Sequence, residues 1–520
     1  MKLEVLDTTL RDGAQGENIS FSVGDKIKIV HALDRLGVDY IEAGIPASNP
    51  KDEMLFGLLE KETLLHAKIV AFASTVKKGV RIEDDKNIAA TLAANTPAVS
   101  VFGKAHFSHT EDILGITGDE NIELVKTTVA YFTQKGREVL FDAEHFFDGY
   151  RENPDYALSV LRAAKEAGAV RLVLCDTNGG MLPDEIAEIV RAVKSAMPDA
   201  VFGIHCHNDS GCAIASTVLA ATEGTVHVQG SFGGIGERCG NADLTAVLPN
   251  LILKRGFESS IVLTKLKGIA GQIGEIANIR IHHNAPYIGR SAFSHKGGTH
   301  VDAEMKKAGA FMHIDPSLVG NESRLLLSEV SGRSTVLPYL QAIAPHLTKQ
   351  SEETERITKK LKEQELLGYQ YEGAGASFEL LVKKELGLWK PHFNVIMYKL
   401  SDDYPEPDEE LLANATVKIE ANGKTALAAG EGNGPMNALY QALSKALASI
   451  YPELVRILMV DFKVRVIESK SFDAKTRVLI EATNGIENFT TIGVSTDMIK
   501  ASFSALVDAY EYHLSKGDNI

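Results

Sequence analysis

The segment LDTTLRDGAQ, residues 6–15, places charged and hydroxyl side chains directly after a short apolar run. The run Leu3 to Leu6 is typical of a buried strand. A surface turn does not require a basic residue next to an acidic one. A site that binds a cation and an anion side by side requires both. Asp12 is therefore a candidate metal ligand, and Arg11 is a candidate partner of an anionic substrate group through its guanidinium fork. A structural ion pair between Arg11 and a nearby carboxylate is the alternative.

A second cluster, His205-Cys206-His207, ends another apolar run. Alternate side chains of a strand share a face, so both imidazoles point the same way, about 6–7 Å apart, and can converge on one divalent cation. Two core histidines are the alternative, and the pattern alone does not decide between them. Asn241 can add an amide oxygen. Such a mixed set of ligands with open positions suits Mn²⁺, Mg²⁺, Co²⁺ or Zn²⁺ acting as a Lewis acid.

The elements that must position these residues alternate regularly up to about residue 255. Eight short apolar runs are separated by amphipathic segments such as 23–37 and 153–168, and the runs are 3–7, 38–44, 67–73, 98–103, 137–144, 170–177, 200–207 and 225–231. Eight β–α units in about 250 residues predict an α/β fold, a TIM (β/α)8 barrel. An open doubly wound sheet is the rival, but the Gly-rich first turn typical of that fold is absent.

The predicted barrel would gather its polar residues at one rim. Catalytic side chains of this fold lie at the carboxyl ends of the strands, and here those ends carry Asp12, Glu144, Thr177, His207 and Asn241 among others. Closure of the barrel brings the first strand beside the eighth, so Asp12 comes close to the two histidines. This concentration of polar residues favours an enzyme over a barrel without catalysis.

Glu144 is a candidate for proton transfer. Phe146 and Phe147 follow it, and an apolar setting would raise the pKa of its carboxyl. A buried ion pair with a base of the rim is the alternative.

The regular alternation stops near residue 256, and this change divides the chain. We expect a catalytic barrel at 1–255, a helical linker region at 256–390 and a C-terminal α+β regulatory and dimerisation domain at 391–520. The last part contains a loose duplication, because 415–447 resembles 462–514. Each half reads as antiparallel strands followed by one amphipathic helix.

Composition limits the possible partners. The 520 residues include 69 acidic and 54 basic side chains, a net charge of −15 without a basic block, which argues against binding to nucleic acid. No apolar stretch approaches the roughly 18 residues of a membrane helix. We expect a cytoplasmic protein that binds neither nucleic acid nor membrane.

Several motifs taken together resemble the 2-isopropylmalate, homocitrate and citramalate synthases. They are LDTTLRDGAQ, EAGIPASNP (42–50), HCHND (205–209), GGIGERCGN (233–241) and SHKGGTHVDAEMKK (294–307), and GEGNGPMNALYQAL (430–443) resembles the allosteric domain of these enzymes. Within the family, RDGAQ, CDTNGGMLP (175–183) and DAEHFFDGY (142–150) are most similar to the long branch of citramalate synthases.

The resemblance implies an activity and roles for individual residues. It implies condensation of acetyl-CoA with pyruvate to give (R)-citramalate and CoA in isoleucine biosynthesis, by a homodimer with isoleucine or leucine as effector. Arg11 would neutralise the developing oxyanion, and Thr177 would bind the substrate carboxylate. His300 would take part in removing the methyl proton, with Glu144 as acid or relay. A tyrosine of the relatives appears here as Phe311, which removes a phenolic proton donor.

Three other functions are weighed against this interpretation. The first is the same reaction on 2-oxoisovalerate, as in 2-isopropylmalate synthase. The second is the reverse chemistry of a hydroxymethylglutaryl-CoA lyase. The third is an inactive barrel that senses amino acids. The long C-terminal module argues against the lyase, and the full set of polar rim residues argues against the inactive barrel.

Overall fold

The structure is a computed structural model that describes residues 2–295, 300, 303–304, 306–307, 309–325, 333–403, 412–452, 454, 457–467, 474–485 and 487–517. It consists of two compact units. The first contains residues 1–293 and 314–323, and the second contains residues 294–313 and 324–520.

The first unit is built around a closed parallel barrel whose strands follow one another in chain order. Its strands are β1 (Glu4–Asp7), β2 (Tyr40–Gly44), β3 (Lys68–Ser74), β4 (Ala98–Lys104), β5 (Glu138–Glu144), β6 (Arg171–Asp176), β7 (Phe202–Cys206) and β8 (His227–Gly230). The barrel closes where β8 pairs with β1, from Glu4 opposite His227 to Asp7 opposite Gly230. The predicted TIM barrel is confirmed, and the closed ring excludes the open doubly wound sheet.

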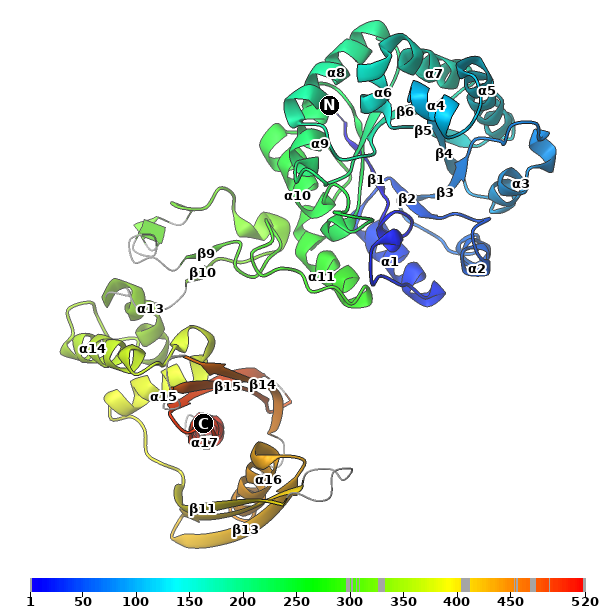
Figure 1. The fold of residues 1–520 in the computed structure, drawn as a ribbon. Helices are drawn as coiled ribbons and strands as arrows, with labels where there is room; N and C mark the ends of the chain where they lie inside the picture. Colours follow the sequence, from blue (N-terminus) through cyan, green and yellow to red (C-terminus); the bar gives the residue numbers. More distant parts are fainter. Residues whose placement is uncertain are drawn as a thin grey trace. The chain divides into compact units, whose positions relative to one another are not determined.

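Helices surround the strands on the outside of the barrel (Figure 1). They are α1 (Val23–Leu36), α2 (Pro50–Leu59), α3 (Lys86–Ala93), α4 (Phe107–Asp112), α5 (Gly118–Gln134), α6 (Phe146–Glu152), α7 (Pro154–Glu166), α8 (Pro183–Ala196), α9 (Ala213–Thr222), α10 (Leu244–Pro249) and α11 (Leu266–Ile276). The predicted helices over 23–37 and 153–168 correspond to α1 and α7.

Local sequence explains where α1 begins and ends. The Ser22 side chain accepts from the Asp25 amide while the Asp25 carboxylate accepts from the Ser22 amide, which satisfies donors that a helix start leaves unpaired. The helix ends at Gly37, whose φ of +95° is left-handed. A Cβ at this position would lie 2.4 Å from the Ser260 carbonyl oxygen, so only glycine fits.

The second unit contains helices and two small antiparallel sheets. Its helices are α13 (Arg333–Ile343), α14 (Glu352–Leu366), α15 (Gly375–Glu385), α16 (Pro435–Ala448) and α17 (Met498–Gly517), and a short parallel pair joins β9 (Ser294–His295) to β10 (Arg324–Leu325). The sheets are β11 (Asn394–Asp403), β12 (Leu412–Ala421) and β13 (Lys424–Gly432), and β14 (Leu458–Val466), β15 (Thr476–Thr483) and β16 (Asn488–Ser495).

The duplication expected in the C-terminal part is present. Each half has three antiparallel strands followed by one helix, α16 or α17. One apolar core spans both halves and includes Val417, Leu443, Ile480 and Leu506.

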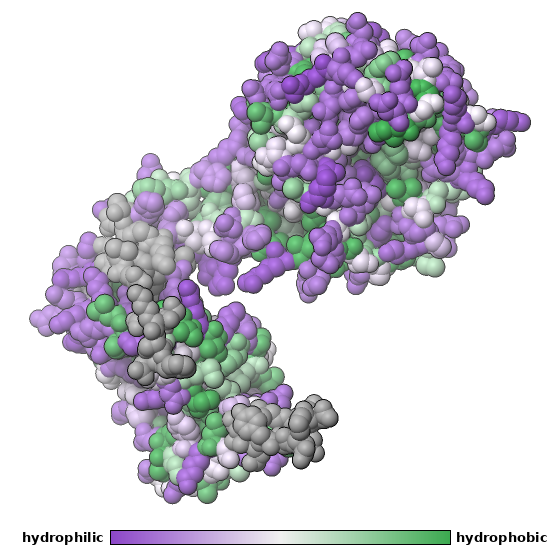
Figure 2. All heavy atoms as spheres, viewed as in Figure 1, coloured by the Kyte–Doolittle hydropathy of each residue, from purple (hydrophilic) through white to green (hydrophobic). Residues whose placement is uncertain are grey.

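Figure 2 shows hydrophilic side chains over much of the viewed surface of the barrel, with apolar side chains between them. Within the described ranges, none of the helices combines the length and hydropathy that a membrane span needs.

Candidate metal centre and active site

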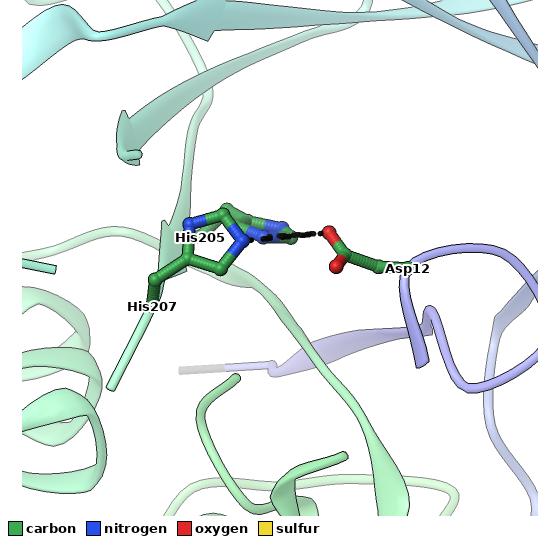
Figure 3. A group of neighbouring side chains, drawn as sticks. All are labelled: Asp12, His205 and His207. Atoms are coloured by element: carbon green, nitrogen blue, oxygen red, sulfur yellow. Dashed lines mark ion pairs between the residues drawn. The ribbon is translucent and has the colours of Figure 1, made fainter. Parts of the chain in front are cut away.

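Asp12, His205 and His207 meet at the carboxyl end of the barrel. Asp12 comes from the turn after β1, His205 from β7 and His207 from the position directly after β7 (Figure 3). Nε2 of His205 and Nε2 of His207 lie 3.5 Å and 3.6 Å from the same oxygen, Oδ2 of Asp12. Among the described residues, these three are the group of His, Cys, Asp and Glu side chains whose atoms could hold a metal ion.

The surroundings of these side chains fit a divalent cation. Nδ1 of His205 lies 2.8 Å from Oε1 of Gln229, an oxygen that can only accept, so Nδ1 carries a proton and Nε2 is the ring nitrogen that faces Asp12. Asn241 donates from Nδ2 to Oδ1 of Asp12, at 3.2 Å, whereas its Oδ1 is buried without a hydrogen-bond partner in the described part of the chain. One carboxylate, two imidazoles and an unpaired amide oxygen form a donor set suited to such an ion.

Asp12 is held in its ionised form. Burial alone would raise the pKa of its carboxyl, but the Arg11 guanidinium and the hydrogen bonds with His205 and His207 lower that pKa well below its usual value. An ionised carboxylate is the form that binds a metal.

Arg11 is engaged by two carboxylates. Nη1 lies 2.9 Å from Oδ2 of Asp12, and Nε lies 2.5 Å from Oε2 of the fully buried Glu42. The guanidinium carbon also stands 4.0 Å above the ring centre of Phe72. The ion pair that was the structural alternative for Arg11 is thus present, and it fixes the guanidinium next to Asp12, where it also lines the cavity.

A cavity of about 220 Å³ opens at this rim. It is lined by Arg11, Asp12, Gln15, Phe72, Phe102, Asp142, Glu144, Cys175, Thr177, His205, His207, Glu237 and Arg238. Burial, followed by repulsion from Glu42, raises the pKa of Asp142 to about 7. The cavity therefore combines two stacked aromatic rings, Phe72 and Phe102 at 5.1 Å, with polar groups that can orient a small acid.

The Thr177 hydroxyl has a hydrogen-bond partner at the edge of the cavity. Its Oγ1 accepts from the backbone amide of His145 at 2.8 Å. With the acceptor side occupied in this way, the hydroxyl proton is available to donate toward the cavity.

The expected apolar setting of Glu144 is wrong. Oε2 of Glu144 lies 2.7 Å from Nζ of Lys104, and the two residues stand opposite each other in the pairing of β4 with β5. Phe146 and Phe147 are buried on α6. Glu144 is therefore one half of an ion pair at the rim, which is the alternative that its sequence context left open.

The cavity contains Arg11, Asp12, Glu144, Thr177, His205 and His207, and Asn241 contacts Asp12. His300 belongs to the second unit, where its exposed ring stacks on Phe311 with the ring centres 4.1 Å apart. The part of His300 in the site stays a prediction.

Sequence reasoning missed Gln229, Lys104 and Arg238. Gln229 is fully buried, and its alternation with His227 along the eighth predicted strand was an available signal for an inward-facing polar residue. Lys104 and Arg238 act through partners on other strands or loops, which no local pattern reveals.

Comparison with known proteins assigns the chain to a family. The HMGL-like family matches residues 2–273, the homocitrate synthase post-HMGL domain-like family matches residues 287–366, and the LeuA allosteric (dimerisation) domain matches residues 372–514.

Full-length relatives agree with these matches. The chain is 44% identical to the (R)-citramalate synthase of Aquifex aeolicus over 520 residues, which is 99% of this chain and 98% of the relative. It is also 44% identical to the (R)-citramalate synthase of Geobacter sulfurreducens, over 100% of this chain and 98% of the relative. The 2-isopropylmalate synthase of Pyrococcus furiosus is 30% identical, over 98% of each chain. The chain therefore belongs to the HMGL-like family, and within it to the (R)-citramalate synthases.

Proposed function

We propose that this protein condenses acetyl-CoA with pyruvate and releases (R)-citramalate and CoA. The observation that carries this proposal is the 44% identity to (R)-citramalate synthases over nearly the whole of both chains. The rim cavity supports it, since a carboxylate, two imidazoles and a guanidinium face a small space there. The citramalate formed would serve isoleucine biosynthesis.

We assign binding roles to residues that line the cavity or contact its lining. Asp12, His205, His207 and the Asn241 amide oxygen would hold a divalent cation, which when bound supplies Lewis acidity toward the ketone and carboxylate oxygens of pyruvate. The Thr177 hydroxyl would donate to the pyruvate carboxylate. Arg11 would stabilise the negative charge that develops on the ketone oxygen, since its guanidinium is already fixed by Glu42 and Phe72.

The reaction also requires proton transfer at two positions of the substrates, the acetyl methyl group and the ketone oxygen of pyruvate. A base takes a proton from the acetyl methyl group, and the resulting carbanion forms the new bond to C2 of pyruvate. The ketone oxygen takes up a proton, and water then cleaves the thioester to a carboxylate and the CoA thiol. We assign the base to His300 and the acid or relay to Glu144, whose carboxylate lies within reach of the Lys104 ammonium.

The ion is one of Mn²⁺, Mg²⁺, Co²⁺ and Zn²⁺. Nitrogen and oxygen ligands with open positions suit each of them. Adding each metal back to the chelated enzyme and measuring release of the CoA thiol identifies the one that supports turnover.

The second candidate is condensation with 2-oxoisovalerate, favoured by the 30% identity to a 2-isopropylmalate synthase. Release of the CoA thiol, measured with pyruvate, 2-oxobutanoate and 2-oxoisovalerate as separate substrates, decides between the two. Pyruvate is expected to give the highest kcat/KM. A preference for the branched acid would replace the citramalate assignment with the second candidate.

The C-terminal domain supports a regulated homodimer. The LeuA allosteric (dimerisation) domain matches 372–514, and the edge strand β14 exposes a row of apolar side chains, Leu458, Val460, Phe462, Val464 and Val466. An exposed apolar row on an edge strand is a surface that a partner covers. We propose a homodimer with isoleucine or leucine as effector. Sedimentation of the full chain and inhibition curves with each amino acid test both parts.

A further inference from the structure

Arg238 adopts a backbone conformation that is uncommon for its type. It lies in the Gly-rich segment between Phe232 and Asn241, and its φ of +55° is left-handed. Residues with a side chain avoid this region, and those that keep it cluster at functional sites where the surrounding contacts fix them. The side-chain contacts of Arg238 therefore indicate what holds this backbone conformation.

One guanidinium joins three loops of the barrel rim. Nε and Nη2 of Arg238 donate to Oδ1 and Oδ2 of Asp209, at 2.8 Å and 3.0 Å, in a bidentate pair. Nη2 also donates to the backbone oxygen of Thr177, at 2.9 Å. Thr177 follows β6, Asp209 follows β7, and Arg238 follows β8.

The joined loops carry residues of the candidate site. Asp209 is two positions after His207, and Asn208 donates from its backbone amide to the Gly240 oxygen at 2.8 Å. Asn241 comes next, and its side chain donates to the Ile235 oxygen and to Asp12. The positions of Thr177 and Asn241 therefore depend on the segment between Phe232 and Asn241, which the contacts of Arg238 hold in place.

We infer that Arg238 is a positioning residue. It fixes the loop of Thr177, whose hydroxyl would donate to the substrate carboxylate, and the loop of Asn241, which would supply a metal ligand. This inference rests on the proposed function. The side chains of Arg238 and Asp209 are 43% and 26% exposed, and so exposed an ion pair adds little to folding stability. The contact therefore serves the geometry of the rim more than the stability of the fold.

The test compares Arg238→Gly and Arg238→Lys with the wild-type full-length protein. Glycine adopts a left-handed φ without strain, so Arg238→Gly keeps the backbone and loses the guanidinium. Titration calorimetry of metal-free protein with Mn²⁺ is expected to give a Kd on the order of tenfold weaker. The KM for pyruvate is expected to rise several-fold, while the thermal unfolding midpoint stays or rises. Arg238→Lys should fall in between, because lysine keeps the charge and loses the fork.

Arg191→Gln is the matched control. It removes the ion pair of Arg191 with Glu223, which has a similar exposure and lies on the outside of the barrel at α8. Both the Kd for Mn²⁺ and the KM for pyruvate should stay at wild-type values in this variant.

The outcomes separate this inference from the proposed function. An unchanged Kd and KM in a folded Arg238→Gly variant overturn the positioning role alone. A wild-type protein that neither binds Mn²⁺ nor releases CoA overturns the proposed function. If Arg238→Gly does not fold, Asp209→Asn decides in its place, because it keeps the size of the side chain and removes the ion pair. Wild-type values in Asp209→Asn would then refute the role.

Discussion

Gln229 holds His205 from inside the barrel. Its Oε1 lies 2.8 Å from Nδ1 of His205, and its Nε2 donates to Oδ1 of Asp142 at 3.1 Å. The amide thus fixes which ring nitrogen of His205 carries the proton. The other nitrogen, Nε2, faces Asp12 and is the ring nitrogen that can bind a metal ion.

Replacement of Gln229 should weaken metal binding. Gln229→Leu removes the acceptor for His205, so we expect the Kd for Mn²⁺ to rise on the order of 10-fold to 100-fold. Gln229→Glu is the matched control, since it keeps an acceptor of the same length and should bind Mn²⁺ more tightly than the leucine variant. Calorimetric titration measures both. Wild-type affinity in Gln229→Leu would show that this amide does not orient the ligand.

Phe102 should control which oxo acid is accepted. Its ring stacks on Phe72 and lines the cavity, so Phe102→Ala enlarges the space next to the polar groups. We expect the kcat/KM for pyruvate to fall, and the preference for 2-oxobutanoate over pyruvate to increase about tenfold, since one methylene in a pocket is worth roughly that factor. Thiol release with each acid measures the ratio of the two kcat/KM values. This ratio is its own control for folding, because a loss of folded enzyme lowers both values equally. An unchanged ratio would show that the methyl group of pyruvate does not lie next to Phe102.

Glu4 should make the stability of the barrel depend on pH in acid. Burial raises the pKa of its carboxyl, but His227 and Arg171 outweigh this effect and lower it from 4.5 to about 2. A depressed carboxyl pKa contributes stability that is complete above about pH 4.5 and is lost as the pH falls toward 2. Glu4→Gln should therefore lower the free energy of unfolding by about 2 kcal/mol at pH 7, less than the full shift implies because solvent screens this partly exposed group, and by less again at pH 3.

Urea unfolding at a series of pH values measures this effect. Glu188→Gln, at an exposed position of α8, is the control and should unfold like the wild type throughout. An equal loss of stability in Glu4→Gln at pH 3 and pH 7 would contradict the assigned ion pairs.

The sequence was sufficient for the barrel and for the approach of Asp12 to the two histidines. Eight apolar runs predicted eight strands, and the closed ring then required Asp12 after the first strand to approach His205 and His207 at the seventh. The expected boundaries near residues 255 and 390 stay predictions.

Contacts across strands could not be predicted in the same way. The pairing of Lys104 with Glu144 depends on the register of β4 against β5, and that register is set by the packing of the whole barrel. Arg238 reaches Asp209 and Thr177 from a backbone with a left-handed φ, which is common for glycine and unexpected for arginine.

We expect one divalent ion to bind between Asp12 and the two histidines and to be required for condensation. Calorimetric titration of metal-free protein with Mn²⁺, in the wild type and in His207→Ala, tests it directly. We predict one ion for each wild-type chain, and no comparable binding in a His207→Ala protein that keeps its wild-type circular dichroism. Equal Mn²⁺ binding by the folded His207→Ala protein would show that the ion does not bind at Asp12 and the two histidines.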